Sequence, residues 1–202
     1  PLEMPLNLDA GAEKRNVLAE FESAAARLRA AARATYQRGR VPSQPSSDWS
    51  AREVLAHIAL WAIQATQHFS QNLPPVDYGN TKQWPALRET FDHAFEFLIQ
   101  PDQAIPEIGW SAVTRAGVTL PLPHPDSPVE HAWVDDAFNA AAIALVEWQS
   151  FAAVLDKTEF AHRKLAELLR LKSSADFAPN SYLYRRMKLV IAHHEEHISA
   201  LN

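Results

Sequence analysis

The chain has 202 residues, of which 47% are hydrophobic and 21% charged, as in ordinary globular proteins of one domain. It contains no cysteine, which excludes a disulfide scaffold, a thiolate zinc site and an iron–sulfur cluster. Its 19 Lys and Arg residues against 24 Asp and Glu residues give a net charge of −5, the wrong sign for broad binding to nucleic acid. We therefore expect one domain over 1–202 and no nucleic-acid partner.

Two further features of the sequence bear on location and fold class. No apolar stretch approaches the roughly 20 residues of a membrane helix, and residues 1–8 lack the basic start and apolar segment of a signal peptide. The chain has only five glycines, whereas β-rich folds and phosphate-binding loops use glycine heavily. We expect a cytoplasmic, all-α protein with no membrane partner.

The first predicted helix covers 10–39, which is rich in the strong helix formers Ala, Glu, Arg and Leu. Apolar residues recur there at steps of three and four, which places on one face Leu18, Phe21, Ala25 and Leu28. Gly39 and the prolines that follow it end the helix.

The second predicted helix, 51–71, has the clearest start in the sequence. Ser50 and Glu53 form an S-x-x-E capping box, in which each side chain accepts a hydrogen bond from a free backbone N–H of the first turn. A shorter helix over 86–99 follows Pro85, because proline is tolerated in the first turn of a helix.

The segment 101–128 differs from the rest of the chain, since it holds six of the 14 prolines and no helical period. A short hairpin is expected over 111–120, where Val113, Val118 and Leu120 are good strand formers. A loop this long in a compact domain is usually a functional cover or a flexible insertion. We expect this insertion to pack near the histidines described below; packing on the outer side of the protein, or a dimer contact, is the alternative.

The helical pattern resumes at 129–155, continues in a shorter helix over 160–171 capped by Asp156-x-x-Glu159, and ends with 181–201. The long helices are expected at 10–39, 51–71, 129–155 and 181–201. Their amphipathic patterns predict a four-helix bundle with accessory short helices, and an irregular all-α fold is the alternative.

Nine histidines occur in the chain, and three of them have spacings suited to a metal ion. His193 and His197 are four residues apart, so they project from one face of the last helix. His57 borders the apolar face of the second helix, and three imidazoles from two helices would form an open site. His194 points into the apolar arc and is expected to be a hydrogen-bonded core histidine.

Each of these residues also has an interpretation without metal. An i,i+4 histidine pair is common on helices, so incidental histidines stay an alternative. Trp61 and Trp148 are expected to be core aromatics, and Glu195 and Glu196 a solvated face or partners of a ligand imidazole. A structural or surface role is expected for the remaining histidines: His68, His93, His124, His131 and His162.

Two motifs resemble those of the DinB-like superfamily. They are W-S-x-x-E-V-L-x-H-I-x-x-W at 49–61 and H-x-x-x-H-I-x-x-L at 193–201. The superfamily includes damage-inducible bundle proteins, mycothiol- and bacillithiol-dependent transferases, and the colibactin-resistance cyclopropane hydrolase group. The resemblance implies an up-down-down-up four-helix bundle and a divalent metal, zinc or nickel, held by His57, His193 and His197. The usual ending differs at Glu196 and Ala200, so no single subfamily is implied.

The leading functional hypothesis is a metal-dependent enzyme that acts on a small molecule by thiol addition, group transfer or hydrolysis. Three neutral histidines leave the charge of a metal ion largely uncompensated, which would acidify a bound water or low-molecular-weight thiol. Glu196 and Glu53 lie near the candidate ligands in sequence, but neither is assigned as the general base. A non-enzymatic metal-binding or stress protein, and a helical interaction module, are the alternatives, and a homodimer stays open.

Overall fold

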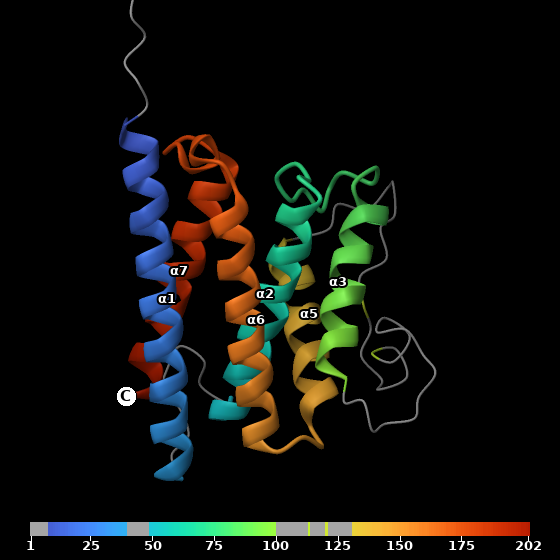
Figure 1. Cartoon of the computed structure of the whole chain (residues 1–202). Helices are drawn as coiled ribbons and strands as arrows, with labels where there is room; N and C mark the ends of the chain where they lie inside the picture. Colours follow the sequence, from blue (N-terminus) through green and yellow to red (C-terminus); the bar gives the residue numbers. More distant parts are fainter. Residues whose placement is uncertain (1–7, 40–48, 100–112, 114–119, 121–130) are drawn as a thin grey trace, which may run out of the picture.

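The computed structural model describes residues 8–39, 49–99, 113, 120 and 131–202 (Figure 1). Within these ranges it is all-α, as predicted, and contains no strand. The α-helices are α1 (Leu8–Gln37), α2 (Ala51–Ser70), α3 (Trp84–Leu98), α5 (His131–Val146), α6 (Phe151–Leu171) and α7 (Tyr182–Leu201), and a 3₁₀ helix, η1 (Ser174–Phe177), precedes α7. No helix among the described residues is long and apolar enough to cross a membrane.

The long helices lie side by side as a bundle. In Figure 1, α1 and α7 run from top to bottom and α2 and α6 run from bottom to top. Helix α7 packs mainly on α1, and α2 packs mainly on α6. Helices α3 and α5 cover the opposite side of α2, so α2 is enclosed by helices on several sides.

The apolar faces predicted from the sequence form the core. Phe21, Leu55, Leu165 and Met187 are fully buried and come from four different helices. Helices α3 and α5 join through Phe91 and Phe138, whose rings stack with their centroids 3.7 Å apart. Burial of such side chains is the main stabilising contribution to a helical protein of this size.

Two helices differ from their predicted bounds. The expected helix 129–155 is interrupted: α5 ends at Val146, and α6 starts at Phe151, where the Ser150 side chain accepts a hydrogen bond from the Ala153 N–H at 3.1 Å. The predicted cap at Asp156 is therefore wrong, because that residue lies inside α6. The apolar period continues through the break, and neither glycine nor proline marks it.

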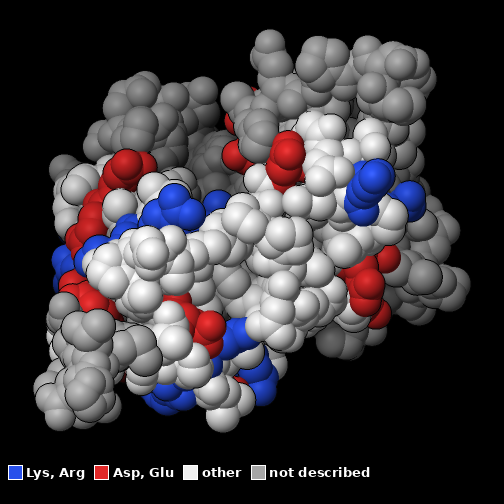
Figure 2. All heavy atoms as spheres, turned by 90° about the horizontal axis from the view of Figure 1, so that it is seen from above, with Lys and Arg blue, Asp and Glu red and all other residues white. Residues whose placement is uncertain are grey.

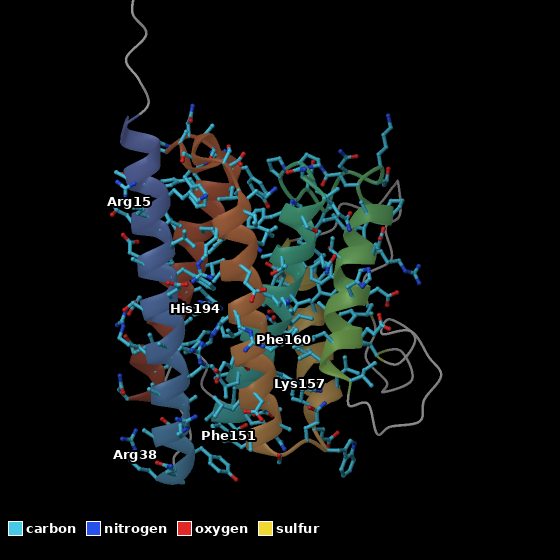
Figure 3. All side chains as sticks on the ribbon, viewed as in Figure 1. Arg15, Arg38, Phe151, Lys157, Phe160 and His194 are labelled. Carbon is cyan, nitrogen blue, oxygen red and sulfur yellow. The ribbon has the colours of Figure 1, made fainter. Side chains whose placement is uncertain are left out.

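The turn between α5 and α6 also holds the end of α3. Gln149 Nε2 donates to the Leu98 carbonyl at 2.6 Å, and Lys157 Nζ donates to the same oxygen at 2.7 Å. Burial lowers the pKa of Lys157, which lies on α6 (Figure 3), to about 8. A donor and a cation at a helix C-terminus satisfy a free carbonyl and interact favourably with the helix dipole. Trp148 in this turn is 80% exposed, so its prediction as a core aromatic is wrong.

Most of the predicted insertion, 101–128, lies outside the described residues. So does the predicted hairpin 111–120 apart from its two described members, Val113 and Leu120. Val113 has helical backbone, Leu120 is in no regular element, and both are buried in the core. The predicted position of the insertion near the histidines stays a prediction.

Exposed ion pairs join α1 to α6 and α7. They are Glu22–Arg170, Glu20–Lys188 and Arg27–Glu195. Figure 2 shows basic and acidic side chains lying next to one another on this side of the molecule. Such exposed pairs contribute little each, about 0–1 kcal/mol, so the packing of α7 depends mainly on buried contacts.

One buried contact between these helices is polar. His194 is 2% exposed and lies inside the bundle (Figure 3), as the sequence predicted. Its Nδ1 is 2.7 Å from the Val190 carbonyl, and its Nε2 is 3.0 Å from His162 Nε2. His162 Nδ1 is in turn 2.7 Å from a guanidinium nitrogen of Arg29. The predicted core role of His194 is confirmed, and His162 is structural.

The direction of each hydrogen bond follows from the two ends of this chain. A carbonyl only accepts, so His194 Nδ1 carries a proton and its Nε2, in the neutral ring, accepts. A guanidinium only donates, so His162 Nδ1 accepts and its Nε2 donates to His194. Each ring is thereby fixed as one neutral tautomer, and α1, α6 and α7 are linked by a chain of satisfied groups.

We expect His162→Leu to destabilise the protein by about 2–4 kcal/mol, because it leaves the buried Nε2 of His194 without its donor and the half-buried Arg29 without the acceptor that it contacts. His162→Gln should cost less than half as much, since its amide can donate to His194 and accept from Arg29. Chemical denaturation of both variants measures the difference. Equal stability of the leucine and glutamine variants would contradict the hydrogen-bond directions given above for Arg29, His162 and His194.

Stability of the metal-free protein should fall in acid. Burial lowers the pKa of His194 to about 4 and that of His162 well below its usual 6.5. The unfolded chain therefore binds more protons than the folded protein below pH 6.5. As the pH falls from 6.5 towards 4, the free energy of unfolding decreases. The decrease is up to about 1.4 kcal/mol per pH unit for each such histidine. Denaturation in chelator between these pH values tests this, and His162→Gln should show a shallower slope than the wild type.

Candidate metal centre

Three predicted histidines meet near one point. His57 on α2 and His193 on α7 approach with their Nε2 atoms 2.7 Å apart, and His197 Nε2 lies 3.1 Å from His193 Nε2. One ligand atom from each of the three residues lies within 4.8 Å of the others. The predicted convergence is confirmed, and this group could hold a metal ion.

Asn139 on α5 determines which nitrogen of His57 faces the centre. Its Oδ1 accepts a hydrogen bond from Trp61 Nε1–H at 2.8 Å and lies 2.7 Å from His57 Nδ1. Indole N–H only donates, so the Asn139 atom must be the carbonyl oxygen, and His57 Nδ1 must carry the proton. The Nε2 of a neutral His57 is then a bare lone pair that points to the other two histidines.

His193 has a looser contact on its outer side. Its Nδ1 lies 3.6 Å from the exposed Glu196 carboxylate, an ion-pair distance that is longer than a hydrogen bond, so the tautomer of His193 is not fixed. The His193 side chain is 42% exposed, whereas His57 and His197 are buried. The group therefore has one side that opens towards solvent, as a site for an exchangeable ligand requires.

Burial keeps the three rings uncharged at neutral pH. It lowers the pKa of His57 well below 6.5 and that of His197 to about 3, and the neighbouring histidines lower both further. Burial also lowers the pKa of His193. A divalent cation would therefore meet neutral imidazoles at pH 7 and would not have to compete with a charged imidazolium.

The donor set fits such an ion. Neutral imidazole nitrogens bind zinc, nickel and related metals, with bonds of about 2.0–2.1 Å to zinc. Tetrahedral bonds of that length separate neighbouring nitrogens by about 3.3 Å, so the His57–His193 pair would part by about 0.6 Å and the His193–His197 pair by about 0.2 Å. Three protein ligands with one open side is the pattern of a catalytic rather than a structural site.

Aromatic rings enclose the buried part of the centre. Trp49 lies 5.1 Å from the His57 ring and stacks on His197 at 6.5 Å, both between ring centroids. Trp61 packs edge-on against Phe91 with centroids 5.5 Å apart and is half-buried, in agreement with its predicted core role. Trp49 therefore packs directly on two of the three histidines, and Trp61 reaches the centre through Asn139.

The predicted acidic residues have separate roles. Glu53 completes the predicted capping box, because it accepts from the Ser50 N–H at 2.5 Å while its own N–H donates to the Ser50 hydroxyl. Glu195 forms an ion pair with Arg27, away from the three rings. Glu196 is the one that contacts a candidate ligand.

The other histidines whose side chains the structure describes do not join this group. His68 is buried and packs its ring edge-on against Tyr182, and His93 is half-exposed beside Glu89. His162 belongs to the buried hydrogen-bond chain with Arg29 and His194 described above. The side chains of His124 and His131 lie outside the described residues.

Sequence reasoning missed Asn139. It lies in an alanine-rich helix with no motif around it, and only the docking of α5 on α2 brings it to His57. A signal for it was its place as a polar residue directly before the apolar run 140–146, but this does not identify its partner.

Comparison of the chain with protein-family models, with curated proteins and with solved structures gives no match.

We expect Asn139→Ala to lower the affinity for divalent metal by about 10–100-fold, because His57 loses the partner that fixes its tautomer and ring orientation. Competition with a chromophoric chelator measures the affinity. Asp136→Asn, an exposed change on the same helix, is the matched control and should bind as tightly as the wild type. An unchanged affinity in Asn139→Ala would show that Asn139 has only a packing role.

Proposed function

We propose that the protein belongs to the DinB-like superfamily and is a metal-dependent enzyme that acts on a small molecule, as a thiol-dependent transferase or a hydrolase. The observation that carries the proposal is the meeting of three neutral imidazoles, from His57, His193 and His197, at one partly exposed point between α2 and α7. The directions of α1, α2, α6 and α7 support the up-down-down-up connection that the superfamily would require.

The residues of the chain have distinct tasks in this proposal. His57, His193 and His197 would hold zinc or nickel, and the ion would supply a positive charge that acidifies a thiol or water and polarises the substrate. Asn139 keeps His57 in the binding tautomer, and Glu196 lies beside the outer nitrogen of His193. Trp49 shields the inner side of the rings, and the exposed side of His193 admits the substrate.

Metal content is the first test. Protein purified without chelator or nickel resin should contain about one divalent ion per chain, and His57→Ala, His193→Ala and His197→Ala should each lower metal affinity at least tenfold. His93→Ala, which removes a half-exposed histidine on α3, is the matched control and should keep the metal. A wild-type protein that binds no divalent ion would overturn the proposal and favour a helical interaction module.

Chelation should lower the melting temperature but leave the protein folded at room temperature. A core of this size does not need a metal to fold, and the metal adds stability only by binding the native state. Thermal melts followed by circular dichroism, with and without chelator, test this. Loss of helix on chelation at room temperature would mark the ion as structural.

Turnover distinguishes an enzyme from a metal-binding protein that catalyses nothing. Metal-loaded protein is incubated with small thiols and electrophilic substrates, and consumption of the thiol is measured. Activity in the wild type that is lost in His57→Ala supports the enzyme, and metal binding without turnover on any substrate supports the non-enzymatic alternative.

A further inference from the structure

Arg186 lies on the same face of α7 as His193. The two residues are seven positions apart, which is close to two helical turns, so their Cα atoms are separated by about 10 Å along the axis and by only about 20° around it. Arg186 is half-buried, and its Cζ lies 5.8 Å from the centroid of the Trp61 ring. Trp61 is one turn beyond His57 on α2, so Arg186 and Trp61 lie on the same side of the candidate centre.

Arg186 has no anionic partner in the part of the chain that the structure describes. It makes no hydrogen bond and no ion pair there, and its contact is with the face of Trp61. Other half-buried arginines are used differently: Arg52 donates to the Glu147 and Gln149 carbonyls at 3.0 Å, and Arg29 contacts His162. The donors of Arg186 are thus left for solvent or a ligand.

The charge of Arg186 reaches Tyr78. It opposes the rise that burial causes in the pKa of the Tyr78 hydroxyl. The Tyr78 hydroxyl donates to Asp135 at 2.9 Å, so one negative and one positive side chain share this region.

Resting on the proposed metal centre, we propose that Arg186 binds the carboxylate of a small organic acid whose reacting group lies at His57, His193 and His197. The planar guanidinium matches the two oxygens of a carboxylate. The Trp61 ring gives the body of the acid an apolar surface, and a separation of about two helical turns suits a body of a few carbon atoms.

The test uses two thiols of equal length, mercaptobutyrate and mercaptobutanol, which differ only in a carboxylate or a hydroxyl at the far end. Each is titrated into the full chain loaded with Co²⁺, and binding is read from the visible absorption of the cobalt ion. The wild type should bind the acid about 10–100-fold more tightly than the alcohol. In Arg186→Gln this preference should fall to about threefold or less, while the affinity for Co²⁺ itself is unchanged.

Two further variants sharpen the comparison. Arg186→Lys keeps the charge but not the planar fork and should retain part of the preference. Arg185→Gln, an exposed change on the neighbouring position, should retain all of it. If Arg186→Gln does not fold, Arg186→Met, which keeps an apolar contact with Trp61, takes its place in the same titration.

The outcomes separate this inference from the function on which it rests. Absence of a cobalt spectrum in the wild type overturns the metal centre and the role of Arg186 together. A normal cobalt spectrum with equal binding of acid and alcohol overturns only the role of Arg186. The same is true if the preference for the acid persists in Arg186→Gln, because the carboxylate then binds the metal directly.

Discussion

The side-chain carbonyl of Asn139 determines which nitrogen of His57 is unprotonated, and the rest of the candidate centre depends on that choice. Trp61 fixes the orientation of the Asn139 amide, because an indole N–H needs an acceptor. The amide in turn fixes the proton of His57 on Nδ1. With the opposite tautomer, the Nε2 of His57 would carry a proton and could not bind a metal. As folded, that Nε2 is a bare lone pair, available to accept from His193 Nε2–H or to bind a cation.

Adjacent residues on α7 serve the core and the candidate centre. His193 and His194 point about 100° apart, as successive helical residues do. His194 is fixed by Val190 and His162 inside the bundle, and that hydrogen-bond chain limits rotation of α7 about its axis. Because His193 and His197 lie on the same rigid helix, their approach to His57 is set by the same contacts. The buried hydrogen-bond chain therefore positions the candidate ligands without contacting them.

The parts of the fold that could be predicted are those encoded locally. Helical period places His193 and His197 on one face, and the Ser50–Glu53 box locates the start of α2 and thus the height of His57. The break between α5 and α6 could not be predicted, because it is held by Gln149 bonding to Leu98, a residue distant in sequence and marked by no glycine or proline.

The same distinction applies to the site. Three histidines with regular spacings and a family resemblance could be found from the sequence, whereas Asn139 and Arg186 could not. Each of these two is a single polar residue whose relevance arises from how two helices dock. Periodicity describes one helix at a time and contains no information about the rotation of α5 on α2, on which the contact of Asn139 with His57 depends.

Helices α3 and α5 lie outside the four long helices, yet they affect the candidate centre through packing. Phe138 directly precedes Asn139 and stacks on Phe91 of α3, while Trp61 packs edge-on against both rings. A shift of α3 would therefore move Phe138, and with it the amide that orients His57. The four long helices supply the ligands, but the neighbouring helices determine whether those ligands have the protonation state that a metal needs. Bundles with the same three histidines can thus differ in metal affinity and substrate access through helices that carry no ligand at all.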